Sequence, residues 1–284
     1  MSVLSPQAIE KIYIECCDAE LLSLKPGNVH IFAEGHDMTV EHFRMAARLS
    51  APFLAAANIP VGQRIEAAVN ATLHELKMNV NLGIILLAAP LIAARQVMVL
   101  SHGVDNFQHS LNDILENLTQ EDAACVYRAI AAANPAGLGN LQRNDVREPP
   151  KLTLLQAMQI SATRDRIAWQ YSHGFVDILT MGVVRINHSF SLGLPLELVM
   201  TSCYLEFFSN FPDSHIERKY GTAKAIQIRD AAQKLVSMTG LGNGLLAHRQ
   251  TLLNWDANLK SESINPGTTA DLTVASLLAS KLAA

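Results

Sequence analysis

Several features that mark other classes of protein are missing from this 284-residue sequence. Its four cysteines form no CxxC pair, and we expect them to be small buried thiols in a reducing compartment. The N-terminal segment lacks the basic flank and apolar run of a secretory signal. The longest apolar run, Gly83 to Ala94, is broken by Pro90 and is far shorter than the roughly 20 residues of a membrane span. We therefore expect a cytoplasmic protein that makes no use of a membrane.

Common nucleotide and hydrolase motifs are also absent. The chain has no GxxxxGK[ST] loop, no HExxH pair and no GxSxG elbow. The glycine-rich stretch from Gly240 to Gly244 follows a helical pattern rather than a strand, so it predicts a helix C-terminus and not a dinucleotide turn. A net charge of −4 without a basic cluster argues against nucleic acid as a partner.

What the sequence does have is helical periodicity. Hydrophobic residues make up 49% of the chain and aromatic residues only 6%, and alanine and leucine dominate the hydrophobic part, which favours closely packed helices over a β-sandwich. Steps of three and four residues recur from Val61 to Leu76. Further helices are predicted from Pro6 to about Leu22, from Thr39 to about Ala57, from Leu82 to about Val99, from Thr119 to Ala133 and, as one helix or two in series, from Thr153 to Met181, with later starts near Leu194, Ser214 and Thr269.

This pattern predicts an all-α fold. We expect a single bundle-like domain over residues 1–284 with a ligand cleft between helices. The loop at 134–150, rich in Asn, Pro and Gly, is the only plausible internal boundary, but the composition does not change across it.

Four polar clusters interrupt the hydrophobic pattern, each on a predicted loop or helix start. They are Lys25–His30 together with Gly35–Met38, Asn79–Gly83, Asp213–Lys219 and Asn265–Asp271. Backbone N–H groups are free at helix starts, and glycine lets a ligand approach the backbone closely. Each cluster therefore has two interpretations, as a phosphate or metal site or as ordinary caps and exposed turns.

The first two clusters contain groups suited to phosphate and to proton transfer. Lys25, His30, His36 and Asp37 lie in or beside a turn whose backbone N–H groups suit an anion. In the second cluster Asn81 is placed to cap the helix that follows it. Upstream, Glu75 lies one helical turn before Asn79.

The last two clusters have the spacing of capping boxes. Ser214 with Glu217, and Thr268 with Asp271, match that spacing without any further function. His215, Arg218 and Lys219 then form either a basic wall for phosphate or a solvated surface. Asp271 is placed to reach a metal held between helices.

Taken together, the clusters resemble the motifs of the triphosphoribosyl-dephospho-CoA synthase family. That family has K-P-G-x-V, N-T-x-x-G, R-K-x-G and P-G-[GT]-[ST]-A-D-L in this order. The present chain has Lys25-Pro26-Gly27-Asn28-Val29, Asn79-Val80-Asn81-Leu82-Gly83, Arg218-Lys219-Tyr220-Gly221 and Pro266-Gly267-Thr268-Thr269-Ala270-Asp271-Leu272. The matches span nearly the whole chain, and four weak motifs in register are fairly specific.

The resemblance implies an all-α transferase that joins ATP to dephospho-CoA, releases adenine and uses Mg²⁺. The implied partners are these small nucleotides, with neither nucleic acid nor membrane, and homo-oligomerisation is left open. We expect Asp37, Asp271 and His36 as catalytic groups and Asp37, Glu75 and Asp271 as metal ligands. The expected substrate-binding residues are Lys25, Gly27, Asn28, His30, Asn79, Asn81, His215, Arg218 and Lys219.

The second motif departs from the members of the family that serve citrate lyase or malonate decarboxylase. Those members have His-Lys where this chain has Asn81-Leu82, and threonine where it has Val80. One alternative is a relative acting on another phosphorylated or ribosylated cofactor precursor, such as one linked to tetrahydromethanopterin-dependent one-carbon metabolism. Another is a non-catalytic helical protein that binds nucleotides or serves as a scaffold.

The resemblance also leads to a geometric prediction. If the clusters form one site, Lys25, Asp37, Asn79, Arg218 and Asp271 line a common pocket, with their polar tips within roughly 15 Å of one centre. Lys25 is expected to be a surface side chain whose removal weakens nucleotide binding without disturbing the fold.

Overall fold

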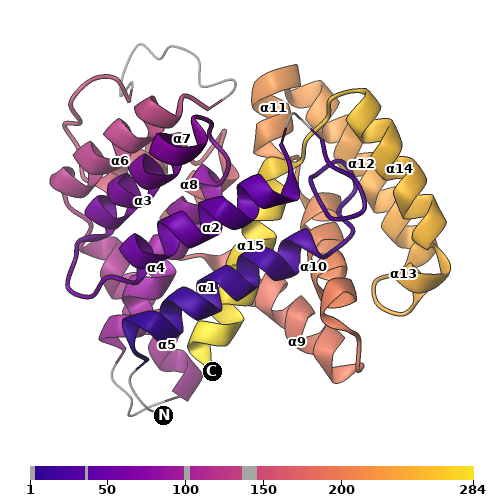
Figure 1. Ribbon diagram of the computed structural model, residues 1–284, viewed down its shortest axis with the longest axis horizontal. Helices are drawn as coiled ribbons and strands as arrows, with labels where there is room; N and C mark the ends of the chain where they lie inside the picture. Colours follow the sequence, from indigo (N-terminus) through magenta and orange to yellow (C-terminus); the bar gives the residue numbers. More distant parts are fainter. Residues whose placement is uncertain (1–3, 36–37, 99–102, 136–145) are drawn as a thin grey trace. The chain divides into compact units, whose positions relative to one another are not determined.

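A computed structural model describes residues 4–35, 38–98, 103–135 and 146–284, and every regular element in these ranges is helical (Figure 1). The backbone pairs in β-fashion at two isolated bridges, His30 with Ala33 and Gly35 with Met38, and no strand forms in the described ranges. The predicted all-α fold is therefore confirmed. The four cysteines are buried, as predicted.

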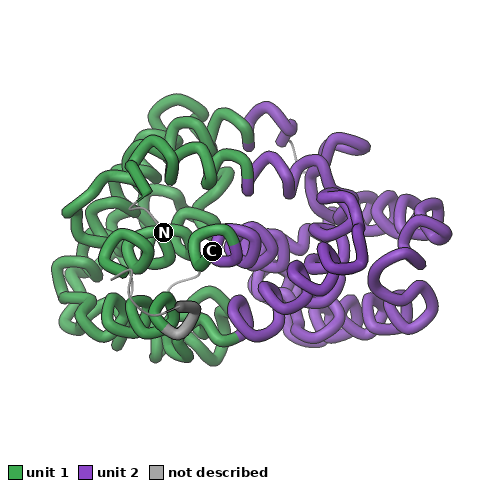
Figure 2. Tube along the Cα trace, turned by 90° about the horizontal axis from the view of Figure 1, so that it is seen from below, with its two compact units in different colours: residues 1–15, 44–176, 281–284 green, residues 16–43, 177–280 purple. Residues whose placement is uncertain are grey.

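The chain divides into two compact units, shown in green and purple in Figure 2. Unit 1 comprises residues 1–15, 44–176 and 281–284, and unit 2 comprises residues 16–43 and 177–280. None of the boundaries between the units falls in the 134–150 segment, where the sequence offered its only plausible break. The single domain over residues 1–284 stays a prediction.

Unit 1 is built around a buried helix. Its helices are most of α1 (Pro6–Leu21) and α2 (Val40–Ala55), then α3 (Val61–Leu76), α4 (Leu82–Val97), α5 (Gly103–Glu116), α6 (Gln120–Ala133), α7 (Leu154–Ser161) and α8 (Arg166–Ser172). Every residue of α4 from Ile84 to Arg95 is buried, so this apolar segment is a core helix. The Tyr171 hydroxyl reaches this core and donates to the Leu86 carbonyl at 2.5 Å.

Unit 2 contains the C-terminal helices and the loop that follows α1. Its elements are a π-helical turn (Ile178–Gly182), α9 (Val183–Ser191), α10 (Leu196–Asn210), α11 (Ser214–Tyr220), α12 (Thr222–Thr239), α13 (Gly244–Ala247), α14 (Arg249–Ser261) and most of α15 (Gly267–Ala283). A core that includes Tyr204, Phe208, Ile216, Ile228 and Leu252 joins α10, α11, α12 and α14.

Two helix predictions need correction. The segment from Thr153 to Met181 is neither one helix nor two in series, because it is broken twice. Residues 162–165 separate α7 from α8, and Gly174 and Phe175, which both adopt positive φ, separate α8 from a π-helical turn. Asn81 does precede α4, but its side chain makes no capping hydrogen bond and instead donates to the Ser50 hydroxyl at 3.3 Å.

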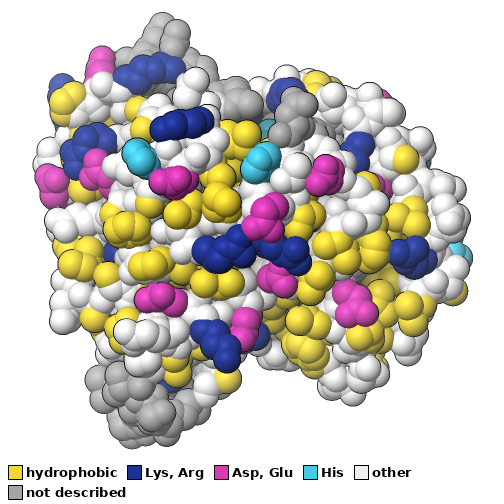
Figure 3. All heavy atoms as spheres, in the orientation of Figure 1, with side chains coloured by type: hydrophobic (Ala, Val, Ile, Leu, Met, Phe, Trp, Pro, Cys, Tyr) yellow, Lys and Arg dark blue, Asp and Glu magenta, His cyan; other side chains and the backbone are white. Residues whose placement is uncertain are grey.

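The described part of the chain contains no helix that is both long and apolar enough to cross a membrane. On the face of the molecule in Figure 3, basic side chains lie interspersed with acidic and hydrophobic ones.

Candidate functional site

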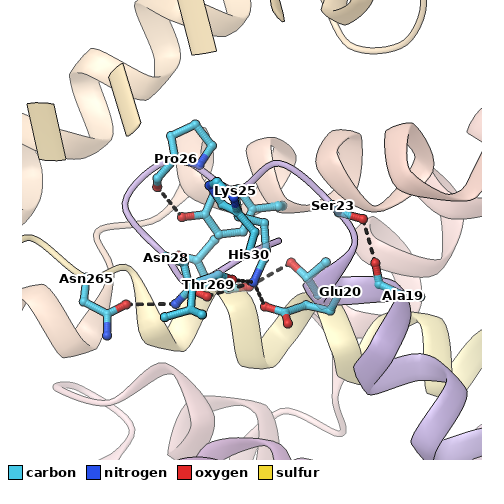
Figure 4. A network of polar contacts seen from close by, with 12 residues as sticks. Ala19, Glu20, Ser23, Lys25, Pro26, Asn28, His30, Asn265 and Thr269 are labelled. Atoms are coloured by element: carbon cyan, nitrogen blue, oxygen red, sulfur yellow. Dashed lines mark hydrogen bonds and ion pairs between the residues drawn. The ribbon is translucent and has the colours of Figure 1, made fainter. Parts of the chain in front are cut away.

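The first and fourth polar clusters pack directly against each other in unit 2. Gly27 has φ +87°, and a Cβ at this position would lie 2.9 Å from Cδ of Pro266, so only glycine fits here. Beside it, the Asn28 amide donates to Oδ1 of Asn265 at 2.8 Å (Figure 4). The K-P-G turn and the N-P-G turn are therefore held together by backbone contact and by an amide pair.

Lys25 is buried beneath this turn, with 0% of its surface exposed. Its Nζ forms an ion pair with the Glu20 carboxylate and donates to Oδ1 of Asn28 at 2.8 Å and to the Val29 carbonyl at 2.7 Å (Figure 4). The expectation of a surface lysine is wrong, because Glu20 in the last turn of α1 draws the ammonium group inward. All three N–H donors of Lys25 are used within the protein.

Burial shifts the ionisation of both partners. Removal from water lowers the pKa of Lys25, and the nearby Glu20 carboxylate opposes that shift. Removal from water likewise raises the pKa of Glu20, and Lys25 opposes that shift. Asp271 also lies close enough to raise the pKa of Lys25, which places the carboxylate of the P-G-T-T-A-D motif in the electric field of the K-P-G lysine.

A second charged group lies on the other side of the turn. The Asp256 carboxylate accepts from the Gly27 N–H at 2.8 Å and lies 3.3 Å from Nε2 of His30 and 3.0 Å from Nζ of Lys260. Nδ1 of His30 accepts from the Phe32 N–H at 3.2 Å, so in the neutral imidazole the proton is on Nε2 and points to Asp256.

The electrostatics of this group favour a neutral histidine beside an ionised aspartate. Burial lowers the pKa of His30, and the hydrogen bond to Asp256 opposes the shift. Burial pushes the pKa of Asp256 upward, but the hydrogen bonds from His30 and Gly27 outweigh it, and the pKa lies below its usual value. Burial also lowers the pKa of Lys260.

The third and fourth clusters are joined by one carboxylate. Oδ1 of Asp213 accepts from the His215 and Ile216 N–H groups at 2.8 and 3.1 Å and thereby caps α11. Oδ2 accepts from the Thr269 N–H and hydroxyl at 2.7 and 2.8 Å in the first turn of α15. The predicted capping box starting at Ser214 is wrong, because Asp213 occupies the cap position. The imidazole of His215 packs on Gly267, where a Cβ would lie 2.6 Å from Nδ1.

The start of α15 also differs from the prediction. The helix begins at Gly267, so Thr268 lies inside the first turn and is not the residue before it. Arg218 and Asp271 are partly buried and Lys219 is exposed, with its ammonium 5.2 Å from the Tyr220 ring centre. Unit 2 thus brings together residues from three of the four clusters.

The remaining cluster belongs to unit 1. Asn79 is partly buried and Asn81 is buried. Glu75 is exposed and lies 3.2 Å from Nδ1 of its neighbour His74. His36 and Asp37 lie outside the described residues. The common pocket for Lys25, Asp37, Asn79, Arg218 and Asp271 therefore stays a prediction.

A metal site built from protein ligands alone is not found among the residues that the structure describes, since no three His, Cys, Asp or Glu side chains are grouped to hold an ion. Mg²⁺, however, is commonly bound by one or two carboxylates and by substrate phosphates. Asp271, just past the first turn of α15, fits that smaller requirement. Glu75 already contacts His74, and Mg²⁺ itself stays a prediction.

Sequence reasoning missed three charged residues that organise the site, Glu20, Asp256 and Lys260, and it included Asp213 in the third cluster without giving it a role. Asp256 and Lys260 are spaced i, i+4 on α14, a spacing from which an ion pair between them could have been predicted. The contact between Gly27 and Asp256 crosses 229 residues, and no local pattern encodes it.

The helical fold and the clustered polar turns define the class first: an all-α enzyme whose candidate site is built from loops and helix starts. The family model described as ATP:dephospho-CoA triphosphoribosyl transferase matches residues 6–284. The chain belongs to this family and is a triphosphoribosyl-dephospho-CoA synthase-like transferase. This confirms the resemblance found in the motifs.

The fold is similar to that of a crystal structure from Archaeoglobus fulgidus, a protein provisionally assigned as a triphosphoribosyl-dephospho-CoA synthase. The TM-score is 0.64 and the sequence identity 22%, over 84% of this chain and 97% of the other. No curated protein matches the sequence.

Proposed function

We propose that this chain transfers the triphosphoribosyl group of ATP to dephospho-CoA and releases adenine. The observation that carries the proposal is the meeting of the K-P-G turn, the start of α11 and the P-G-T-T-A-D turn in unit 2. The start of α11 and the P-G-T-T-A-D turn lie about 190 and about 240 residues after the K-P-G turn. Helix capping alone gives no reason for segments so far apart in the chain to meet. The family match over residues 6–284 supports the same reaction.

The proposed reaction exchanges one bond at the anomeric carbon. A ribose hydroxyl oxygen of the acceptor bonds to C1′ of the ATP ribose while the C1′–N9 bond breaks, and adenine leaves with that electron pair and takes up a proton. The hydroxyl proton passes to a base. By analogy with glycoside chemistry the transition state resembles an oxocarbenium ion, which a nearby carboxylate stabilises.

Asp271 is the described residue best placed to act as this base or as a metal ligand. It lies just past the first turn of α15, two residues after Thr269, whose N–H and hydroxyl donate to Asp213. His36 and Asp37 are the other proposed catalytic groups. When bound, Mg²⁺ would neutralise the triphosphate, with Asp271 as a protein ligand and Asp37 and Glu75 as further candidates.

The phosphate contacts are proposed to come from α11. His215, Arg218 and Lys219 lie within two turns of its N-terminus, and the backbone of Gly27 and Asn28 lies in the turn that packs against Pro266. Lys25 and His30 stabilise the conformation of this turn from inside the protein, because Lys25 pairs with Glu20 and His30 with Asp256. Asn79 and Asn81 are proposed to bind substrate from unit 1.

The test is adenine release from ATP plus dephospho-CoA with Mg²⁺, followed by chromatography. Asp271→Asn should lower the rate by about 100-fold or more, as expected for loss of a proton-transfer group. Asp230→Asn, a carboxylate of the same unit paired with its neighbour Arg229, should leave the rate unchanged. Release of ADP or AMP alone would refute the reaction, and equal rates for the two variants would refute the role of Asp271.

A second candidate keeps the chemistry and changes the acceptor. It is favoured by Asn81 and Leu82, which are uncharged and stand where relatives have His-Lys. This chain therefore has one phosphate contact fewer than those relatives. Metabolite profiling of a deletion strain separates the two. Loss of acylated citrate lyase or malonate decarboxylase supports dephospho-CoA, whereas an intact lyase with a one-carbon growth defect supports another precursor.

A further inference from the structure

Unit 1 contains a cavity of about 580 Å³ that none of the motif residues line. It lies between the start of α1, the turn before α3, the C-terminal end of α4 and the turn before α6. Most of its wall is apolar and includes Ile9, Ile59, Val97, Ile114 and Leu118. Its volume falls in the range of small-molecule sites.

Two arginines of this wall are buried without a carboxylate partner. Arg64 is 4% exposed and Arg95 is 7% exposed. The Arg64 guanidinium donates to the Ile59 and Leu54 carbonyls at 2.7 and 3.0 Å, and burial lowers its pKa to about 10, so it stays charged at neutral pH. Within the described ranges, neither arginine forms an ion pair. Buried charges are normally paired, so this arrangement is incomplete without an anion.

The one carboxylate in the wall does not supply that anion. Asp122 accepts from the Gly62 N–H at 2.8 Å and from the Thr119 N–H and hydroxyl at 2.8 and 2.7 Å. These neutral donors use its oxygens to fix the starts of α3 and α6. With two guanidinium groups and one carboxylate, the lining residues carry a net charge of +1.

Two buried polar atoms on residues of the wall are left without hydrogen bonds. Nε of Arg95 and Oε1 of Gln96 are buried and have no partner among the described residues. Nε2 of Gln96 donates to the Ala55 carbonyl at 2.8 Å, which identifies Oε1 as an acceptor. A buried polar group that nothing satisfies destabilises the folded protein. Two residues of the wall therefore leave one charged donor and one neutral acceptor without a partner.

We propose that this cavity is a second ligand site that binds a small organic acid with an apolar body. The carboxylate pairs with the Nε edge of Arg95, whose planar fork matches two carboxylate oxygens. A hydroxyl or N–H next to the carboxylate donates to Oε1 of Gln96. The apolar body packs on Ile9, Ile59 and Leu118.

This site is separate from the second motif in unit 1. Asn79–Gly83 lies at the N-terminal end of α4, whereas Arg95 and Gln96 lie at its C-terminal end. A helix of this length spans ~24 Å. Binding here does not depend on the proposed transfer reaction, and the two can fail independently.

The test is calorimetric titration of the full chain with 2-hydroxyoctanoate. Binding is expected to weaken about tenfold or more in Arg95→Met, and less in Gln96→Leu, because a charged hydrogen bond contributes more than a neutral one. Arg164→Met, which removes an exposed arginine of the same unit, should bind as the wild type does. The neutral 1,2-octanediol and inorganic phosphate should both bind more weakly than the acid.

Stability provides an independent measurement. Arg95→Met removes an unpaired buried charge, so its midpoint of unfolding without ligand should equal or exceed that of the wild type. If this variant does not fold, Arg95→Lys, which keeps the charge and loses the fork, should bind the acid about fivefold more weakly. No binding of the acid by the wild type, or equal binding by a folded Arg95 variant, overturns the proposal.

Discussion

At the scale of single residues, the K-P-G motif has a structural role that its sequence conceals. A lysine beside glycine and proline in a turn suggests an exposed phosphate ligand, yet the Lys25 ammonium lies inside unit 2 on the Glu20 carboxylate and two loop oxygens. A buried ion pair of this kind is costly to break, because removing one partner leaves the other charged and desolvated. Lys25 thereby determines the conformation in which Gly27 meets Pro266.

Lys25→Met should therefore destabilise the protein instead of leaving the fold intact. We expect a loss of about 3–5 kcal/mol in the free energy of unfolding, measured by urea denaturation. The double variant Lys25→Met with Glu20→Leu should recover much of this loss, since no buried charge remains. Lys11→Met, on the exposed face of α1, serves as the control and should change the free energy by less than about 0.5 kcal/mol. A small loss in Lys25→Met would contradict the structural role.

At the scale of elements, two aspartates each organise two helix starts. Asp122 completes the capping box of α6 with one oxygen and holds the first turn of α3 with the other. Asp213 caps α11 with one oxygen and holds the first turn of α15 with the other. A carboxylate near a helix N-terminus is favourable because it meets free N–H groups and the positive end of the helix dipole. Sharing one carboxylate between two helices also fixes their spacing.

Gly62 is a position of close backbone contact between α3 and α6. A Cβ there would lie 2.5 Å from Cα and 2.7 Å from the carbonyl oxygen of Asp122, and backbone cannot move aside as a side chain would. Gly62→Ala should lower the free energy of unfolding by about 1–3 kcal/mol, although alanine is favoured over glycine inside a helix by about 1 kcal/mol. Gln63→Ala, at the exposed neighbouring position, is the control. Stabilisation by Gly62→Ala in thermal or urea unfolding would show that the helices can separate without cost.

The helices themselves were predictable to very different degrees. The hydrophobic pattern located α3, α4 and α6 closely, because each has a sustained pattern of apolar residues between flanking turns. The burial of Ala225, Ile228, Ala232 and Leu235 in α12 follows the same steps of three and four, so that helix could have been predicted as well. The left-handed break at Gly174 and Phe175 could not, because the aromatic residue that adopts it has no local preference for positive φ.

At the scale of the whole molecule, the motifs identified the family, while the charges that support them came only from the structure. Lys25, Gly27, Asn28 and His30 were predicted as ligand contacts, but their partners Glu20 and Asp256 lie in helices with no motif of their own. Such pairings depend on tertiary packing over long sequence separations. The result is a site whose turn is held by buried ionisable groups, so the stability of the chain is tied to pH.

His30 should determine part of this pH dependence. Burial lowers the pKa of His30 in the folded state, so below its unfolded value of about 6.5 the unfolded chain binds the extra proton and the folded chain does not. Stability contributed by neutral His30 is therefore complete above pH 6.5 and declines as the pH falls from there, by at most about 1.4 kcal/mol per pH unit. Asp256, whose pKa is lowered, stays ionised in this window, and both Lys25 and Lys260 oppose a positive charge on His30.

The measurement is the free energy of unfolding by urea at a series of pH values from 7.5 to 5, in wild type and in His30→Gln. Glutamine cannot take up the proton, so the stability difference between the two proteins should shrink as the solution is acidified, even though the variant is less stable at pH 7.5. His74→Gln, which replaces an exposed imidazole, gives the matched comparison. Parallel curves for wild type and His30→Gln would mean that the histidine is protonated equally in both states, and the proposed neutral hydrogen bond from Nε2 to Asp256 would then be wrong.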